Sequence, residues 1–201
     1  MTGKQGQSTF FVAVLVSAAL LAGCAGGPTP PDWQLNARAA LQGFEKHYLE
    51  GNTKLAELEF MRAKDEIRAT GRADLVARVE LVRCAARTAS LEIDNCPGFE
   101  SLRRDAGAEE LAYADYLAGK GWHAVSEDPL SRLVAAGVAF RSGSVTPAQI
   151  GAAIELASAQ GWRRPLLAWL EVEAKRAEAA GDRAAVERLR RRIGLVAGPR
   201  S

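Results

Sequence analysis

The sequence has few aromatic residues, few histidines and none of the apolar–polar alternation that is typical of β-strands. Aromatic residues make up 6% of its 201 residues, and valine and isoleucine are sparse beyond residue 23. Because β-sheets are built mainly from β-branched and aromatic side chains, this composition argues against a β-sandwich. Alanine is abundant instead, and it is the strongest helix former. The sequence therefore predicts an all-α protein.

Residues for metal binding or covalent catalysis are also scarce. The two histidines are His47 and His123, and neither stands at metal-ligand spacing from a cysteine or a carboxylate. There is no Gly-x-Ser-x-Gly motif, and Gly119-Lys120-Gly121 lacks the spacing and the hydroxyl of a phosphate-binding loop. We therefore expect no catalytic residues, no metal and no cofactor.

The chain has no excess of charge of one sign and no apolar run long enough to cross a membrane. It carries 26 basic and 24 acidic residues, and only Lys4 of these lies before residue 24. This balance gives no electrostatic case for nucleic acid as a partner. The apolar stretch from Phe10 to Leu21 is much shorter than the roughly 20 residues of a spanning helix. It is typical of the apolar core of a signal peptide.

Directly after this stretch, residues 21–24 read Leu-Ala-Gly-Cys, which resembles the lipobox of bacterial lipoproteins. The resemblance implies a signal peptide over residues 1–23, cleavage after Gly23, and a diacylglyceryl group and an acylated amine on Cys24. In that family Asp after the lipidated Cys tends to retain the protein in the inner membrane, whereas Ala25 follows here. We therefore expect a lipid anchor on the periplasmic side of the outer membrane. The alternative is a small buried Cys that happens to follow an apolar stretch.

Two regions follow the expected cleavage site. Residues 24–32 are rich in Gly and Pro and predict a flexible tether, and residues 33–198 predict an all-helical domain. Apolar residues three or four positions apart predict helices over 33–50, 53–70 and 75–94, a short one over 99–104, and others over 109–117, 129–140, 147–159, 165–180 and 182–196. Thr146 and Gln149 form the pattern of a capping box, and Asp128 before Pro129 is typical of a helix start.

Residues 37–70 resemble one tetratricopeptide repeat. The positions that match are Leu41, Phe44 and Tyr48 in the first helix, Gly51 in the turn, and Ala56, Phe60 and Ala63 in the second helix. The turn is one residue short, Glu45 replaces a small residue, and no proline closes the unit. The resemblance implies antiparallel helical hairpins stacked into an α-solenoid array.

Once Cys24 is assigned to lipid, Cys84 and Cys96 remain as an even pair in an oxidising compartment. We expect a disulfide between them, closed by the turn Asn95-Cys96-Pro97-Gly98. The alternative is two free thiols, with Cys84 a small core residue.

Clusters of charge offer the remaining candidate sites. A basic run near the end of the chain consists of Arg188, Arg190, Arg191 and Arg192. One interpretation is a docking surface for an acidic partner or for anionic headgroups. The other is a solvated face whose arginines pair with Glu187. Arg78, Arg83 and Arg87 predict a solvated face, with Glu80 in reach of Arg83. The adjacent carboxylates Glu109-Glu110 and Glu127-Asp128 point about 100° apart on a helix, so they predict charge at helix starts.

We therefore predict a non-catalytic, lipid-anchored periplasmic scaffold or adaptor that binds another protein of the cell envelope, with the oligomeric state open. One alternative is an enzyme of cell-wall turnover, which needs two carboxylates, or a carboxylate and His123, in one deep pocket. Another is a carrier of a small apolar ligand, which needs a cavity lined by residues such as Trp122, Trp162 and Trp169. Tryptophans of this kind are more often plain core.

Overall fold

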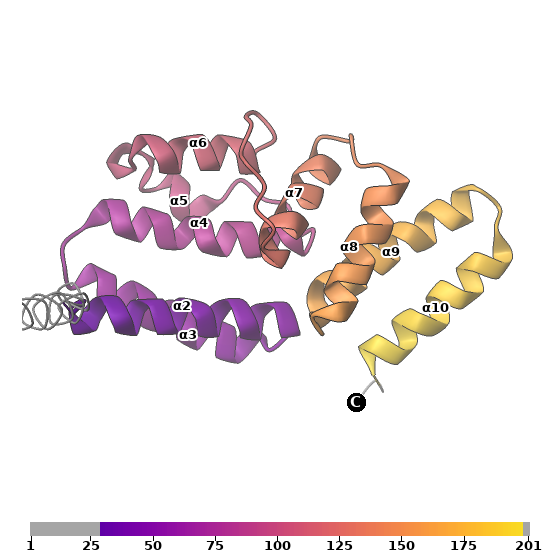
Figure 1. The fold of residues 1–201 in the computed structure, drawn as a ribbon, viewed down its shortest axis with the longest axis horizontal. Helices are drawn as coiled ribbons and strands as arrows, with labels where there is room; N and C mark the ends of the chain where they lie inside the picture. Colours follow the sequence, from indigo (N-terminus) through magenta and orange to yellow (C-terminus); the bar gives the residue numbers. More distant parts are fainter. Residues whose placement is uncertain (1–28, 199–201) are drawn as a thin grey trace, which may run out of the picture. The chain divides into compact units, whose positions relative to one another are not determined.

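The computed structural model describes residues 29–198, and it shows an all-α domain with antiparallel helix pairs (Figure 1). The expected signal peptide and Cys24 lie outside the described residues. The elements are α2 Asp32–Glu50, α3 Thr53–Arg68, α4 Ala73–Ala89, α5 Pro97–Glu100, the 3-10 turn η2 Arg103–Asp105, α6 Ala108–Leu117, α7 Pro129–Arg141, α8 Pro147–Ala159, α9 Arg163–Ala179 and α10 Arg183–Ala197. Among the residues described, no helix is long and apolar enough to cross a membrane.

α2 and α3 form a tight antiparallel hairpin because their apolar stripes face each other. Most of the side chains predicted from spacing are buried: Ala37, Ala40, Phe44 and Tyr48 on α2, and Ala56, Phe60, Ala63 and Ile67 on α3. Trp33 and Leu41, which belong to the same stripe of α2, are partly buried. The rings of Phe44 and Phe60 pack at 5.2 Å between centroids. Gly51 closes the turn with a φ of 88°, a left-handed backbone that favours glycine.

α4 lies between the hairpin of α2 and α3 and the helices α5 and α6 (Figure 1). α2 and α3 pack on one side of it, and α5, η2, α6 and α7 also contact it (Figure 1). Ten of its seventeen residues are buried, so its pattern is apolar around most of its circumference rather than along one stripe. The helix was expected to continue to Asp94 but ends at Ala89, because Leu91 takes a left-handed backbone with a φ of 58° and turns the chain away.

The C-terminal helices begin largely where the sequence predicts. The Thr146 hydroxyl accepts a hydrogen bond from the Gln149 N–H at 3.2 Å, and the Gln149 side chain accepts from the Thr146 N–H at 2.8 Å, so the capping box is confirmed. The Asp128 carboxylate caps α7 by accepting from the Ser131 N–H at 2.9 Å. α9 begins at Arg163, two residues before the expected Pro165.

α9 contacts a helix far from it in sequence. It packs on α2 as well as on its neighbours α8 and α10. The indole N–H of Trp169, which is fully buried, donates to the carbonyl of Ala89 at the end of α4 at 3.1 Å. The predicted antiparallel helix pairs are thus confirmed. In a linear stack each helix would contact only its neighbours along the chain, but α4 and α9 also contact helices further away in sequence.

Candidate functional site

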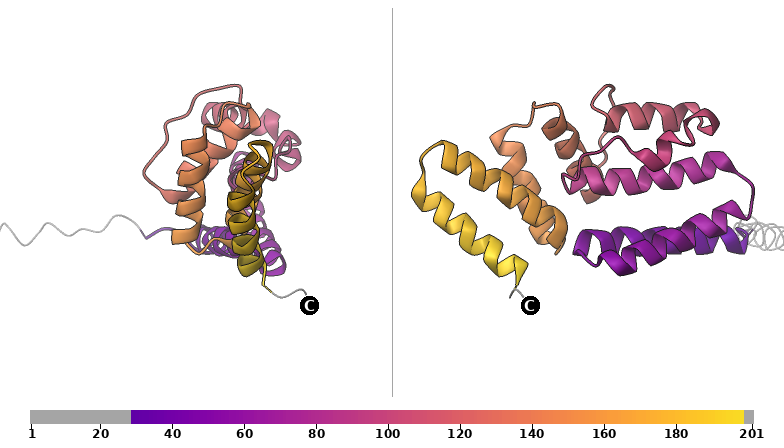
Figure 2. Two further views of the ribbon diagram at one scale, coloured as in Figure 1. Left: turned by 90° about the vertical axis from the view of Figure 1, so that its right-hand side faces the viewer. Right: turned by 180° about the vertical axis from the view of Figure 1, so that it is seen from behind.

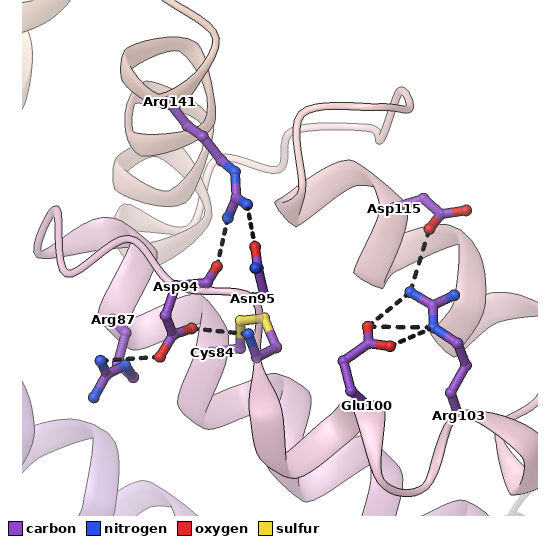
Figure 3. The surroundings of a disulfide bond; sticks show 9 residues. Cys84, Arg87, Asp94, Asn95, Glu100, Arg103, Asp115 and Arg141 are labelled. Atoms are coloured by element: carbon purple, nitrogen blue, oxygen red, sulfur yellow. Dashed lines mark hydrogen bonds and ion pairs between the residues drawn. A yellow bond between two sulfur atoms is a disulfide. The ribbon is translucent and has the colours of Figure 1, made fainter.

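A disulfide joins α4 to the segment that follows it (Figure 3). Cys84 is buried on α4, Cys96 precedes α5 with a φ of 48°, and their Cα atoms lie 5.6 Å apart. The Cys96 N–H donates to the Asp94 carboxylate at 2.9 Å, which holds the left-handed turn. The disulfide expected from the sequence is therefore present in the structure.

Arginines from two helices fasten this turn. Arg87 on α4 pairs with the Asp94 carboxylate at 3.0 Å. Arg141 at the end of α7 donates to the Asp94 carbonyl at 2.6 Å and to the Asn95 side-chain oxygen at 2.9 Å (Figure 3). The segment after α4 is thus tied to α4 by a covalent bond and to α7 by hydrogen bonds.

A largely buried ion pair lies beside the turn. Lys64 on α3 pairs with Glu80 on α4, and the two side chains are 14% and 8% exposed. The sequence predicted that Glu80 would pair with Arg83 along the helix, and this was wrong because Glu80 faces α3. Gly98 packs directly on the Glu80 carboxylate, where a Cβ atom would overlap the carboxylate oxygens. A side chain at position 98 would therefore require the Glu80 carboxylate to shift.

Two polar grooves open on either side of the turn and share Asp94 and Cys96. The first, of about 380 Å³, is lined by Lys64, Glu80, Arg83, Cys84, Arg87, Asp94, Cys96, Pro97 and Gly98. The second, of about 630 Å³, is lined by Asp94, Asn95, Cys96, Glu100, Arg103, Ala114, Asp115, Ala118, Lys120 and Arg141. We call these the α3–α4 groove and the α5–α6 groove.

Every carboxylate that lines these grooves has a cationic partner. Glu80 pairs with Lys64 and Asp94 with Arg87, and Arg103 pairs with Glu100 at 2.9 Å and Asp115 at 3.5 Å. The hydrogen bond from Arg103 lowers the pKa of Glu100. A carboxylate whose pKa is lowered in this way does not serve as a general acid at neutral pH. The grooves offer charged hydrogen-bonding groups for a polar ligand or peptide.

Cys84, Asp94 and Cys96 also bring three potential metal ligands within 4.8 Å of one another. Cysteine binds metals as a thiolate, and a disulfide presents none. Both Asp94 oxygens are already engaged, one by the Cys96 N–H and the other by Arg87. With the disulfide formed, this cluster does not suit a metal.

The terminal arginines lie on α10, an outer helix that has no buried residue. Arg190 was expected to pair with Glu187, but it reaches across to Glu171 at 3.0 Å and Glu178 at 2.9 Å on α9. Arg191 pairs with Glu187 at 3.8 Å, as its spacing predicts, and Arg192 pairs with Glu155 on α8 at 3.3 Å. Within residues 29–198, Arg188 has no ion pair. Much of this basic run is thus balanced by acids of the domain itself.

The other arginine cluster also pairs between elements rather than along α4. Arg78 pairs with Glu110, which lowers the pKa of that carboxyl through their hydrogen bond. Arg83 reaches Glu57 on α3 at 3.5 Å. Glu110 lies in the first turn of α6, as expected for charge at a helix start.

The remaining candidates lie on or near the exposed segment 119–128. His123 packs against Tyr113 and Tyr116, with ring centroids 4.9 and 5.4 Å away. Glu45 was not singled out from the sequence, but burial and, to a lesser extent, the charge of Asp128 raise its pKa. A tetratricopeptide repeat has a small residue at the position of Glu45. This departure from the repeat pattern is the sequence feature that could have pointed to Glu45.

The three tryptophans proposed to line a cavity do not lie together in one environment. Trp122 is 84% exposed, so the expectation that it belongs to the core was wrong, whereas Trp169 is fully buried and Trp162 is partly buried. Segment 119–128 runs along the surface, and the Trp122 side chain on it is exposed to solvent.

No family model, curated protein or solved structure is similar enough to this chain to count as a match. A role for the protein therefore has to be argued from its own residues.

Proposed function

We propose that the chain is a lipid-anchored periplasmic adaptor that binds another protein of the cell envelope and is not an enzyme. The main support for a periplasmic location is the Cys84–Cys96 disulfide. Disulfides persist in oxidising compartments and are rare in the cytosol. A disulfide in a chain whose third cysteine follows an apolar leader supports export and lipidation at Cys24, with the outer membrane favoured by Ala25.

The grooves support the adaptor role. They are polar, they lie beside a turn fixed by a disulfide and by two arginines, and their carboxylates are ion-paired. A fixed surface with paired charges suits recognition, because a bound segment exchanges hydrogen bonds with groups that are already in place. The hairpin of α2 and α3, with the spacing of a tetratricopeptide repeat, supports membership of the helical-repeat adaptors by analogy of fold.

A cell-wall enzyme is the second candidate, and one observation favours it. Burial raises the pKa of Glu45, and the charge of Asp128 raises it further. Glycan hydrolysis uses a pair of carboxyl groups, and the one that acts as general acid has a raised pKa. Neither residue lines the two polar grooves, so the adaptor is the stronger proposal.

The adaptor proposal is tested by crosslinking in intact cells and identification of the captured neighbours by mass spectrometry. Lys120→Glu reverses a charge in the α5–α6 groove, and Lys175→Glu reverses a charge that is also exposed, on α9, as a control. We expect Lys120→Glu to reduce recovery of the partner and Lys175→Glu to leave it unchanged. Equal recovery from both variants would mean that the partner does not bind at the α5–α6 groove. The double variant Arg190→Glu/Arg191→Glu would then test binding at α10.

The anchor is tested by membrane fractionation of the wild type and of Cys24→Ala. We expect the wild type to sediment with membranes after a high-salt wash, and the variant to be released by it, since salt screens any remaining charge attraction. A variant that stays with the membrane after that wash would contradict lipid tethering.

A further inference from the structure

Trp122 is the most exposed large apolar side chain in the part of the chain that the structure describes. It is 84% exposed, and Val125 on the same segment is 50% exposed. An aromatic side chain that becomes buried removes about 150–250 Å² of surface from water. Tryptophan is also enriched among the residues that contribute most to binding between proteins. Trp122 therefore marks this segment as a candidate contact surface.

The segment that carries Trp122 is held at both ends. Near its start, the His123 ring packs against Tyr113 and Tyr116 on α6. At its end, the Asp128 carboxylate caps α7. The His123 ring thus lies on the domain, whereas the ring of its neighbour Trp122 is left in solvent. A side chain presented from a fixed segment loses little conformational freedom when a partner covers it.

A mainly apolar groove lies beside this segment, between α7 and α8. Its volume is about 230 Å³, and it is lined by Val125, Arg132, Ala135, Ala136, Gln149, Ala152, Ala153 and Leu156. Pockets that hold drug-sized molecules have volumes of about 300–1,000 Å³. This groove is smaller, so it suits one large side chain better than a ligand of that size. We call it the α7–α8 groove.

Trp122 lies close to this groove without filling it. Val125 lines the groove, and the three residue steps from Trp122 to Val125 span at most about 11 Å. The segment crosses in front of α7 in Figure 1, and it runs along the outer edge of the domain in the left view of Figure 2. An exposed indole and an open apolar groove therefore lie near each other on the surface of the same chain.

Unpaired charges of both signs lie on the same surface. Arg132 lines the groove and Glu127 lies on the segment; both are exposed, and neither has an ion pair within residues 29–198. Of the other acids nearby, Asp128 caps α7, and Glu155 on α8 pairs with Arg192 at 3.3 Å. A patch with one unpaired base and one unpaired acid is complementary in charge to a copy of itself.

We infer that the chain forms a two-fold symmetric dimer in which Trp122 of each copy enters the α7–α8 groove of the other. In such a dimer the same patch meets itself, so the indole and the groove of each copy are both used. Glu127 of one copy then faces Arg132 of the other. The inference goes beyond the proposed function and depends neither on lipidation of Cys24 nor on a partner in the envelope.

The contact is small. Two indoles bury about 300–500 Å² of their own surface, and the grooves that they enter are covered as well. Standard interfaces between proteins bury about 1,200–2,000 Å² in total. We therefore expect a weak dimer whose population rises with the concentration of the protein.

The test places a photoreactive amino acid, p-benzoylphenylalanine, in the full-length chain in cells, where it replaces Trp122. Leu195, which is 83% exposed on α10, is replaced in the matched control. After irradiation, the covalent products are separated by size, and the crosslinked peptides are identified by mass spectrometry. We expect replacement of Trp122 to give a covalent dimer with its crosslink in the α7–α8 groove of the second copy, and replacement of Leu195 to give none.

A second substitution in the same photoreactive chain tests the groove. Ala152→Phe fills the groove from an exposed position of α8, and Ala159→Phe adds the same ring at an exposed position near the end of that helix. We expect Ala152→Phe to lower the yield of covalent dimer at least about tenfold and Ala159→Phe to leave it unchanged. Equal yields from these two variants would overturn the inference.

Other products of the first experiment also contradict the inference. A crosslink within one monomer would place Trp122 in the groove of its own chain. A crosslink to lipid or to a different protein would assign the exposed indole to that occupant instead of a second copy. No crosslink at all would mean that the indole stays in solvent.

Discussion

Gly137 lies where α7 closely approaches α4, and replacing it with alanine tests the packing directly. A Cβ atom at Gly137 on α7 would lie 2.9 Å from the carbonyl carbon of Thr88 on α4, and closer still to the carbonyl oxygen. In an unobstructed helix the change from Gly to Ala gains about 1 kcal/mol of stability from helix propensity. Overpacking against a fixed backbone costs about 1–3 kcal/mol. We expect the steric cost to exceed the gain, and Gly137→Ala to be less stable than the wild type by up to about 2 kcal/mol.

Gly151 provides the matched control. It lies inside α8, and a Cβ atom there would have no heavy atom within 4 Å. We expect Gly151→Ala to gain about 0.5–1 kcal/mol, so the two variants should move the midpoint of urea unfolding in opposite directions. Equal shifts for the two variants, or a more stable Gly137→Ala, would refute the close approach of α4 and α7.

Three further predictions concern the region around α4. Reduction of the Cys84–Cys96 disulfide, whose cysteines are 12 residues apart, should lower the free energy of unfolding by about 3 kcal/mol in urea, with the Cys84→Ala/Cys96→Ala variant insensitive to reductant. Lys64→Met strands a buried Glu80 carboxylate and should cost about 3–5 kcal/mol in the same assay. Because the folded state raises the pKa of Glu45, it binds that proton more firmly than the unfolded chain does, and stability falls as pH rises between the two pKa values. Glu45→Gln should therefore match the wild type in stability at low pH and exceed it at neutral pH.

Each of these predictions has an outcome that contradicts it. Unfolding curves that coincide with and without reductant would mean that the disulfide adds no stability. Arg72→Met removes an exposed pair with Asp74, and a loss as large as that of Lys64→Met would show that burial of the Lys64–Glu80 pair is not what matters. A Glu45→Gln variant that is less stable at neutral pH would reverse the sign assigned to the burial of that carboxyl.

The sequence predicted most helices because their signals are local. The apolar stripes of α2 and α3 are buried as their spacing indicates, and the Thr146–Gln149 capping box lies within four residues. The end of α4 was mispredicted for a physical reason. Apolar spacing continues to Ile93, but the chain leaves the helix at Ala89 so that Asp94 can meet Arg87 and Cys96 can meet Cys84.

The candidate site could be predicted only in part, since its members come from distant elements. The disulfide could be predicted because the prediction needed only the number of cysteines and the expected oxidising compartment, not a contact between helices. Arg141 binds the Asp94 carbonyl from 47 positions away, and Lys64 reaches Glu80 across 16. No periodicity within one helix encodes such pairs. The exposure of Trp122 was missed for a similar reason. Whether an aromatic side chain on a loop is buried depends on contacts with distant parts of the chain, which the local sequence does not show.

The central place of α4 limits how this domain can evolve. In a linear stack of hairpins, a unit can be duplicated or lost with changes only at the joints. Here one helix is shared by the hairpin of α2 and α3, by α6 and by α7, and α9 reaches back to α2. Removing α2 and α3, or α6 and α7, would leave α4 exposed on that side. Relatives of this chain should therefore keep the helices that pack on α4, and length variation should fall in segment 119–128.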